Sequence, residues 1–153
     1  MNKYELLISD LAQHLTVFDL ELSVNETCQA VINDRYNVNI EVSTNYDSIF
    51  LYWQLALSDT ILSEDVLHKL LSFGYMGLAT NGAFFSINKS DELIFCRRVN
   101  SEELTSLVFT KIFDGFVDAI IYCDKEVSRL VKSSEVAVSL SHNVTSEDFF
   151  LRV

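Results

Sequence analysis

The chain has 153 residues, of which 22 are acidic and 11 are basic, so its formal charge at pH 7 is −11. Hydrophobic residues make up 49% of the sequence, and the mean hydropathy is +0.20. The length suits one domain with a substantial core. The acidic balance argues against binding to nucleic acid or to an anionic membrane, because both need a basic surface. A chain that is both acidic and apolar is expected to keep apolar surface for another protein.

The sequence gives no sign of export or of membrane insertion. The first residues lack the unbroken apolar run and the small-residue cleavage site of a signal peptide. The densest apolar stretch, residues 104–121, is interrupted by three charged residues, so no membrane span is expected. The cysteines are Cys28, Cys96 and Cys123. Their odd number and wide spacing predict reduced, mostly buried thiols in a cytoplasmic protein.

The first half of the chain predicts one helix and three strands. Residues 2–16 carry a single apolar stripe at helical spacing. The stripe consists of Tyr4, Leu7, Ile8, Leu11 and Leu15. Residues 27–33 and 36–43 alternate as half-buried strands, and residues 48–57 form the most apolar strand. In that strand Phe50 and Tyr52 lie opposite the face of Trp53, so we expect the second face to be partly covered as well.

The second half predicts a short helix, a hairpin and a long helix. Residues 64–73 form the short helix, with Ser63 as its N-cap and Gly74 at its C′ position. Residues 82–88 and 91–98 form the hairpin, and either Leu93 and Phe95 or Ile94 and Cys96 face the core.

Residues 101–129 form the long helix, with a capping box at Asn100 and Glu103. Leu104, Val108, Ile112 and Phe116 make its main stripe, extended sideways by Phe109, Phe113, Ile120 and Val127.

The elements define an α+β fold in the order α-β-β-β-α-β-β-α. A meander followed by a hairpin predicts a twisted antiparallel sheet with helices mainly on one face. We assign residues 1–132 to a single domain. Residues 133–153 differ in composition, and residues 135–140 alternate like a strand. This tail is expected either to be mobile or to dock on a partner.

No motif predicts catalysis, a metal or a cofactor. His14, His68 and His142 have no ligand partner at metal spacing, and phosphate loops and nucleophile elbows are absent. The protein is therefore not expected to be an enzyme, although a catalytic site assembled only in the fold stays open as an alternative. Arg97 and Arg98 form the one adjacent basic pair. They either balance Glu102 and Glu103 locally or contact an acidic partner.

Several segments together resemble the class I type III secretion chaperones, the effector chaperones of the Tir-chaperone or SycE-like type. They include the opening helix YELLISDLAQHL, the strand segments CQAVIN, YNVNIEV and SIFLYWQLAL, and the short helix EDVLHKLL. The loop and strand GYMGLATNGAFFSIN, the strand DELIFCRRV and the long helix SEELTSLVFTKIFDGFVDAII complete the likeness. It covers roughly residues 2–130, and size, acidity and element order carry it more than any single motif.

The resemblance implies a cytoplasmic homodimer from a Gram-negative bacterium with an injection system. Such a chaperone binds the N-terminal region of one or more secreted effectors in an extended, non-globular state. Cargo side chains enter apolar grooves and cargo backbone adds a strand to the sheet. The complex is then recognised at the export apparatus, including its ATPase. No nucleic acid, membrane or cofactor is implied.

The resemblance also assigns residues by position. The dimer interface would contain Leu67, Leu70, Leu71, Phe84 and Phe85. The cargo surface would contain Leu7, Leu11, Leu15, Phe50 and Tyr52. Each of these side chains also suits a core, and for Leu11 and Leu71 a core role is the stronger reading.

A different class of protein fits the same pattern. It is a small α+β ligand-binding or sensor domain with a pocket between sheet and helices, lined by Trp53, Phe85 and Phe113. A bound metabolite would distinguish it from a chaperone.

Overall fold

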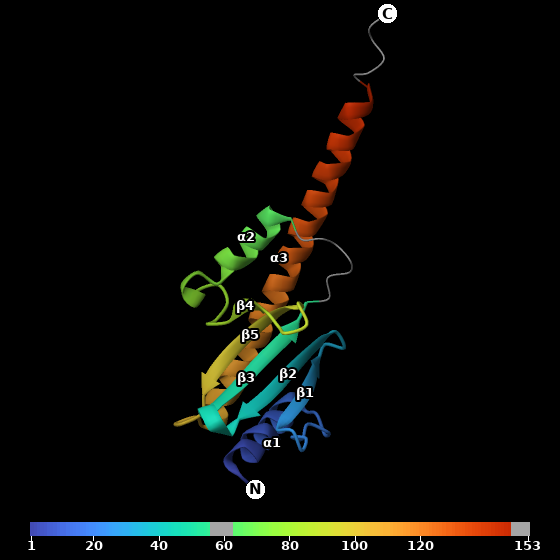
Figure 1. Ribbon diagram of the computed structural model, residues 1–153. Coiled ribbons are helices and arrows are strands. Elements are labelled where there is room, and N and C mark those ends of the chain that lie inside the picture. The colour runs from blue at the N-terminus through green and yellow to red at the C-terminus, as the bar shows by residue number, and fades with distance from the viewer. Residues whose placement is uncertain (56–62, 148–153) are drawn as a thin grey trace, which may run out of the picture.

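The computed structural model describes residues 1–55 and 63–147 of the chain (Figure 1). Three α-helices are present in this part: α1 (Lys3–Leu15), α2 (Glu64–Phe73) and α3 (Ser106–Glu147). The strands are β1 (Thr27–Ile32), β2 (Tyr36–Ser43), β3 (Ser48–Gln54), β4 (Phe84–Ile87) and β5 (Leu93–Asn100). The predicted order of elements and the α+β class are confirmed.

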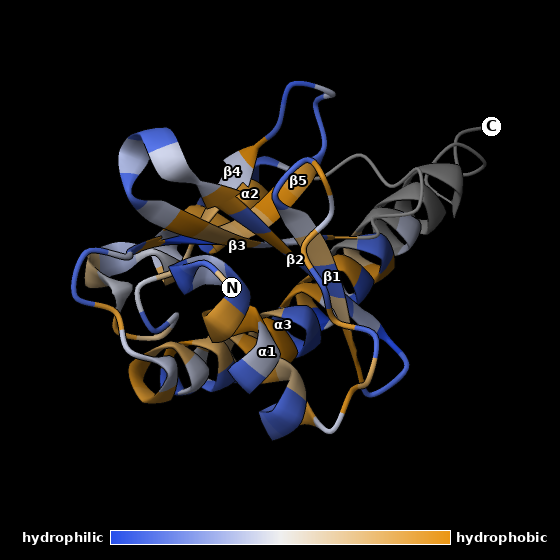
Figure 2. Ribbon diagram, turned by 90° about the horizontal axis from the view of Figure 1, so that it is seen from below, coloured by the Kyte–Doolittle hydropathy of each residue, from blue (hydrophilic) through white to orange (hydrophobic). Residues whose placement is uncertain are grey.

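The five strands form one antiparallel sheet in the order β1-β2-β3-β5-β4. Helices α1 and α3 lie against the same face of this sheet, which we call the inner face (Figure 2). Helix α2 packs at the end of the sheet, where it contacts β4 and α3 (Figure 1). The predicted placement of helices mainly on one face is therefore confirmed.

Alternation along the strands separates the inner face from the opposite, outer face. All four apolar residues of β2 are buried: Tyr36, Val38, Ile40 and Val42. In β3, Ile49, Leu51 and Trp53 point inward, whereas Phe50 and Tyr52 are half-buried on the outer face. In the hairpin, Phe95 is fully buried, so Leu93 and Phe95 face the core.

Aromatic rings link the sheet to α3 in the centre of the core. The ring of Phe95 stacks on that of Phe116, with centroids 5.6 Å apart and planes 7° apart. Phe85 of β4 packs on the other side of Phe95 at 4.8 Å between centroids. Paired aromatic rings stabilise a fold by more than their buried area alone accounts for, so these contacts hold the hairpin against α3.

Helix α3 begins later than the capping-box pattern predicts. The Asn100 side chain accepts a hydrogen bond from the Glu102 amide (2.9 Å) within a turn, so the predicted capping box is wrong. The helix starts at Ser106, and the hydroxyl of Thr105 accepts from the Val108 amide at 3.4 Å. The start at Ser106 leaves Val108 46% exposed. The core stripe of α3 is instead Phe109, Phe113, Phe116, Ile120 and Val127.

The strand-like segment 135–140 continues α3 as helix, so the strand expectation is wrong. Extending an existing helix adds one backbone hydrogen bond for each residue that is fixed, whereas a new strand needs a partner. The alternation of apolar and polar residues in this segment does not by itself distinguish a strand from a continuation of the helix. The last six residues, 148–153, lie outside the described part of the chain, as do residues 56–62 of the predicted third strand and the connection that follows it.

The ends of α2 agree only in part with the sequence. The Ser63 hydroxyl accepts from the Val66 amide at 3.3 Å, which confirms the N-cap. Gly74 has φ −73°, so it does not end the helix in a left-handed conformation. The chain reverses two residues later, where Met76 (φ 54°) and Gly77 (φ 65°) have positive φ. The side chains of Tyr75 and Leu78, on either side of this reversal, are exposed.

Candidate interaction surfaces

The described residues offer little to nucleophilic or metal chemistry. Among residues 1–55 and 63–147, no group of three His, Cys, Asp or Glu side chains could hold a metal ion. Burial raises the pKa of the Cys28 and Cys123 thiols to about 11, so both are protonated near neutral pH. None of the helices in this part is long and apolar enough to cross a membrane.

Exposed apolar side chains gather where α2, the following turn and β4 meet. This surface, the α2–β4 face, consists of Leu67, Leu71, Tyr75, Met76, Leu78 and Phe84. The Cβ of Phe84 lies 3.9 Å from the position that a Gly74 Cβ would take, so β4 and the end of α2 are in contact. An apolar patch of this kind on a soluble domain is typical of a protein interface.

The predicted dimer residues divide between this face and the core. Leu67, Leu71 and Phe84 are exposed on the α2–β4 face, and Leu71 is 70% exposed. Leu70 is 1% exposed, so it cannot contact a second subunit in this structure. Phe85 is half-buried beside Phe95. Helix geometry explains the division, because residues 70 and 71 lie about 100° apart around the axis.

The predicted cargo residues divide in the same way. Leu7 and Leu11 are 2% and 0% exposed beneath the sheet, so they are core residues and offer no surface to cargo. The single stripe of α1 faces the inner side of the sheet, which explains their burial. Leu15, at the end of the helix, is half-buried. Phe50 and Tyr52 lie half-buried on the outer face.

Phe50 and Tyr52 belong to an apolar strip that crosses the outer face. Register places Tyr52 beside Cys96 and Cys96 beside Phe84, so the strip reaches the α2–β4 face. We call these residues, with Phe50, the outer strip. The Arg98 guanidinium lies over the Phe50 ring at 5.9 Å, and its Nε donates to the Ser48 hydroxyl at 2.9 Å. Burial, together with the negative charge of Glu41, raises the pKa of the Tyr52 hydroxyl.

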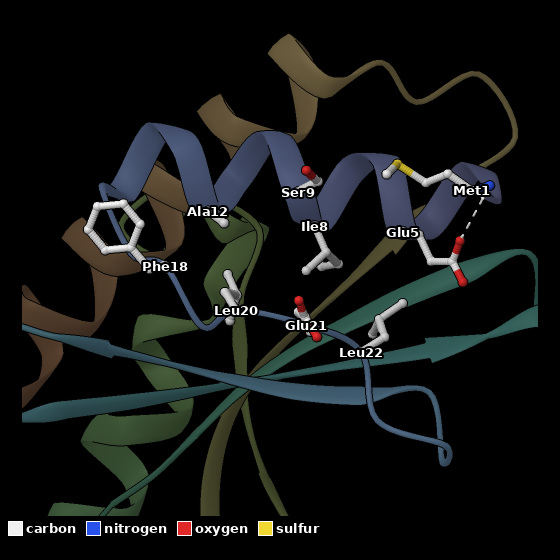
Figure 3. Close-up of a pocket in the computed structure, with 9 residues that line it drawn as sticks. All are labelled: Met1, Glu5, Ile8, Ser9, Ala12, Phe18, Leu20, Glu21 and Leu22. Carbon is white, nitrogen blue, oxygen red and sulfur yellow. Dashed lines mark ion pairs between the residues drawn. The ribbon is translucent and has the colours of Figure 1, made fainter.

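A groove lies between α1 and the segment that follows it (Figure 3). It has a volume of about 520 Å³, and Ile8 and Ala12 of α1 point toward Leu20 across it. Leu20 is buried, whereas Phe18 at one end is 93% exposed. The remaining lining residues are Met1, Glu5, Ser9, Glu21 and Leu22.

This groove was not anticipated from the sequence. Residues 17–26 show neither helical nor strand-like order over a full element. The available signal was a short alternation, with Phe18, Leu20 and Leu22 separated by Asp19 and Glu21. In the structure Leu20 is buried and lines the groove together with Glu21 and Leu22.

The sheet has an open edge at β1. The Ser23 amide donates to the Thr27 carbonyl at 2.8 Å, so the polar groups of Thr27 point away from β2. In an antiparallel strand these directions alternate, and Gln29 and Val31 therefore also direct their backbone groups outward. Val31 is half-exposed at this edge. A strand with free outward groups can pair with an added chain.

The three rings predicted to line a ligand pocket all pack in or against the hydrophobic core. Trp53 meets Tyr36 edge-on, with centroids 5.8 Å apart, and Phe113 is fully buried. Phe85 packs on Phe95 as described above. Of the three rings, Trp53 lines a pocket of about 480 Å³ with Tyr36 and Asp124, and Phe85 and Phe113 are not among the residues that line it.

The fold and these surfaces define a small α+β protein built to contact other polypeptides. The family model of the Tir chaperone protein (CesT) family matches residues 6–123. The chain belongs to this family, which confirms the resemblance found in the sequence. A search of curated proteins gives no match.

Chains of several solved complexes share the fold. A chain of the HopA1–SchA chaperone–effector complex is 16% identical, with a TM-score of 0.63, covering 80% of this chain and 93% of that one. A chain of the ExsC–ExsE complex is 14% identical, with a TM-score of 0.68, and the shares are 80% and 92%. A chain of the Yersinia pestis type III secretion chaperone SycH with a fragment of YscM2 is 13% identical, with a TM-score of 0.59 and shares of 78% and 98%.

Proposed function

We propose that this protein is a type III secretion chaperone that binds the N-terminal region of one or more effectors. It holds that region extended and non-globular, keeps the effector soluble and competent for secretion, and delivers it to the export apparatus and its ATPase. Membership of the Tir chaperone family carries the proposal. The exposed apolar surfaces on a domain of charge −11 support it, because such charge keeps apolar grooves soluble.

The working form in this proposal is a homodimer joined through the α2–β4 face. Leu67, Leu71 and Phe84 supply exposed apolar contacts there, and Leu70 and Phe85 support them from beneath. A stable interface buries about 800 Å² on each partner with an apolar centre. A cluster of six exposed apolar side chains is a suitable centre for an interface of that size.

The cargo surface in this proposal combines grooves with a sheet edge. The groove between α1 and residues 18–22 accepts apolar side chains, with Phe18 at its mouth, and Leu15 is a half-buried residue at the end of α1 outside its lining. The outer strip, with Phe50 and Tyr52, provides a second apolar site. The open edge of β1 offers backbone pairing to an extended segment.

The proposed role involves no catalysis and no cofactor. High thiol pKa values at Cys28 and Cys123 agree with that, because neutral thiols are poor nucleophiles. The ExoU–SpcU and ExoT–SpcS complexes of Pseudomonas aeruginosa share the fold and lend further support to effector binding. The same role places the protein in the bacterial cytoplasm.

Affinity capture from the host tests this function. Tagged protein should retain secreted effectors, identified by mass spectrometry, and should lose each one when that effector's N-terminal region is deleted. Retention of the export ATPase as well would support delivery. Capture that does not depend on the N-terminal region, or recovery of the protein without any secreted protein, would contradict the proposal.

A further inference from the structure

The sheet has a second open edge, along the C-terminal half of β5. Strand β4 pairs with β5 only from Leu93 to Cys96, because Phe84, the first residue of β4, lies opposite Cys96. Strand β3 continues beside β5 on the other side as far as Asn100. Residues 97–100 are therefore paired with β3 alone.

Two hydrogen bonds establish which backbone groups face this edge. The Ser101 amide donates to the Asp47 carbonyl (2.8 Å), and the Leu93 carbonyl accepts from the Leu55 amide (3.1 Å). The backbone polar groups of Leu93 and Ser101, both odd-numbered, therefore point toward β3. Because these directions alternate along a strand, the backbone N–H and C=O groups of Arg98 and Asn100 point away from β3, toward the open edge. No loop in the described part of the chain donates a backbone hydrogen bond to either residue or accepts one from it. Both residues are exposed.

A groove of about 450 Å³ runs below this edge, between β5 and the start of α3. Its apolar lining comes from Val99, Leu104, Val108 and Ile112. Val108 is 46% exposed and Ile112 is half-buried, so apolar surface is left open there. A chain added beside Arg98 and Asn100 would direct every second side chain into this groove.

The groove also contains an arginine without an acidic partner. Arg97 lies opposite the fully buried Leu51, so its side chain starts on the inner face, and it reaches over Gly82. Among the described residues it forms no hydrogen bond or ion pair, and burial lowers its pKa. A half-buried cation is costly unless an anion or a set of acceptors compensates it.

The local charge balance considered from the sequence is not found. Glu102 and Glu103 also line the groove and are exposed, and neither forms an ion pair with Arg97 or Arg98. Arg98 instead lies on the outer face against Phe50 and Ser48. Neither arginine has an acidic partner among the described residues, and of the two it is Arg97 whose side chain starts on the inner face, beside the groove.

We infer that the β5 edge binds an extended segment of the cargo protein that carries an acidic residue and, two positions away, an apolar one. The segment adds a strand beside Arg98 and Asn100. Its acidic side chain pairs with Arg97, and its apolar side chain lies on Val108 and Ile112. This inference rests on the proposed function, and it names a site separate from the β1 edge and a sequence preference for part of the cargo.

The test uses the full-length protein and short synthetic peptides of alternating threonine and valine. One peptide carries a central aspartate in place of a valine, its matched partner carries lysine there, and a third has the aspartate but N-methylated alternate amides. The aspartate peptide should bind about tenfold more tightly than the lysine peptide, because only the aspartate can form a charge-assisted pair with Arg97. Arg97→Gln should abolish this preference, and N-methylation should abolish binding.

Arg129→Gln is the matched control, because it removes an exposed arginine that pairs only with Glu126 on its own helix. It should leave the preference unchanged. Amide exchange measured by NMR should slow at Arg98 and Asn100 when the aspartate peptide is added, and Ser101, already bonded to Asp47, should not change. Protection of these amides in the free protein that disappears on dilution would assign the edge to a second subunit and overturn the inference.

Two further outcomes separate this inference from the proposed function. If wild-type protein captures effectors and the peptides do not bind, or bind without preference for aspartate, the β5 site is wrong and the chaperone function stands. If no effector is captured from the host, the proposed function fails, whatever the peptides do.

Discussion

At the scale of single residues, exposure separates the side chains that hold the fold from those that meet a partner. Adjacent leucines in α2 illustrate this, since Leu70 is 1% exposed and Leu71 is 70% exposed. The same distinction holds between Leu11 beneath the sheet and Phe50 on its outer face. Substitutions at such pairs should therefore affect different properties.

Leu71→Asp should dissociate the dimer and preserve the fold. A charge in the centre of an apolar interface is desolvated without a partner, so the dimer dissociation constant should rise by at least about tenfold. Light scattering after size exclusion reports the mass, and circular dichroism reports the fold. Lys69→Asp, exposed on the same helix outside the α2–β4 face, is the control and should stay dimeric. A dimeric Leu71→Asp at micromolar concentration would disprove the interface.

Leu11→Ala should destabilise the protein by about 2–5 kcal/mol, the usual range for a buried leucine. The Phe50→Ala/Tyr52→Ala double variant should cost much less stability and weaken effector binding by about tenfold. Urea unfolding measures the first effect, and titration with a captured effector measures the second. Loss of folding in the double variant would show that the outer strip belongs to the core.

Stability should decrease in the alkaline range because of the buried thiols. The pKa of Cys28 and of Cys123 is raised from 9.0 to about 11 in the folded protein, so the folded state favours the neutral thiol. Both contributions are present below pH 9 and are lost as pH rises from 9 toward 11. The raised pKa of Tyr36, due mainly to burial, acts in the same direction.

Denaturant unfolding at a series of pH values measures this loss. The Cys28→Ala/Cys123→Ala variant should lose less stability between pH 9 and 11 than the wild type. An equal loss in both proteins would assign the alkaline sensitivity to other groups.

At the scale of elements, the strands and short helices were more predictable than the long helix. The clean alternation of residues 36–43 fixed both ends of β2, and Ser63 marked the start of α2. These signals are local, so a partner elsewhere in the chain does not change them. Before α3, the Asn100 side chain accepts a hydrogen bond within a turn, and Thr105 accepts one from the first turn of the helix. Contact with the sheet then determines that Phe109 and Phe113 are buried and Val108 is exposed.

The candidate surfaces were less predictable than the elements. Leucines of one stripe look the same in sequence whether they face the sheet or a partner, so the resemblance places Leu7 and Leu11 on the cargo surface, although the stripe alone favours the core for Leu11. The β5 edge is open because β4 begins only at Phe84, opposite Cys96, which leaves residues 97–100 of β5 without a partner on that side. Such features arise from register, and a single sequence does not fix register.

Helix α3 also gives a prediction at this scale. Val127 is buried, whereas the described side chains beyond Lys132 are exposed. Removing residues 133–153 should therefore leave the melting temperature within a few degrees and preserve the dimer, if residues 1–132 form the domain. Differential scanning calorimetry measures the first property. A large loss of stability would place the domain boundary further along α3.

At the scale of the whole molecule, charge and apolar surface act together. A charge of −11 keeps the α2–β4 face, the outer strip and the α1 groove in solution without a partner. Two open edges, along β1 and along the part of β5 that extends beyond β4, offer backbone pairing on opposite sides of the sheet, and a dimer would double them. A long extended segment can then contact several weak sites on one particle, which gives affinity without requiring the cargo to fold.

The most direct test of the proposed dimeric effector chaperone is native mass spectrometry of the tagged protein, purified from its host with its bound partner. We expect a particle that contains two copies of this chain and an effector. Limited proteolysis should reduce that effector to its N-terminal region without dissociating it. A monomer without effector, or a dimer that holds a small metabolite in place of a polypeptide, would contradict this proposal.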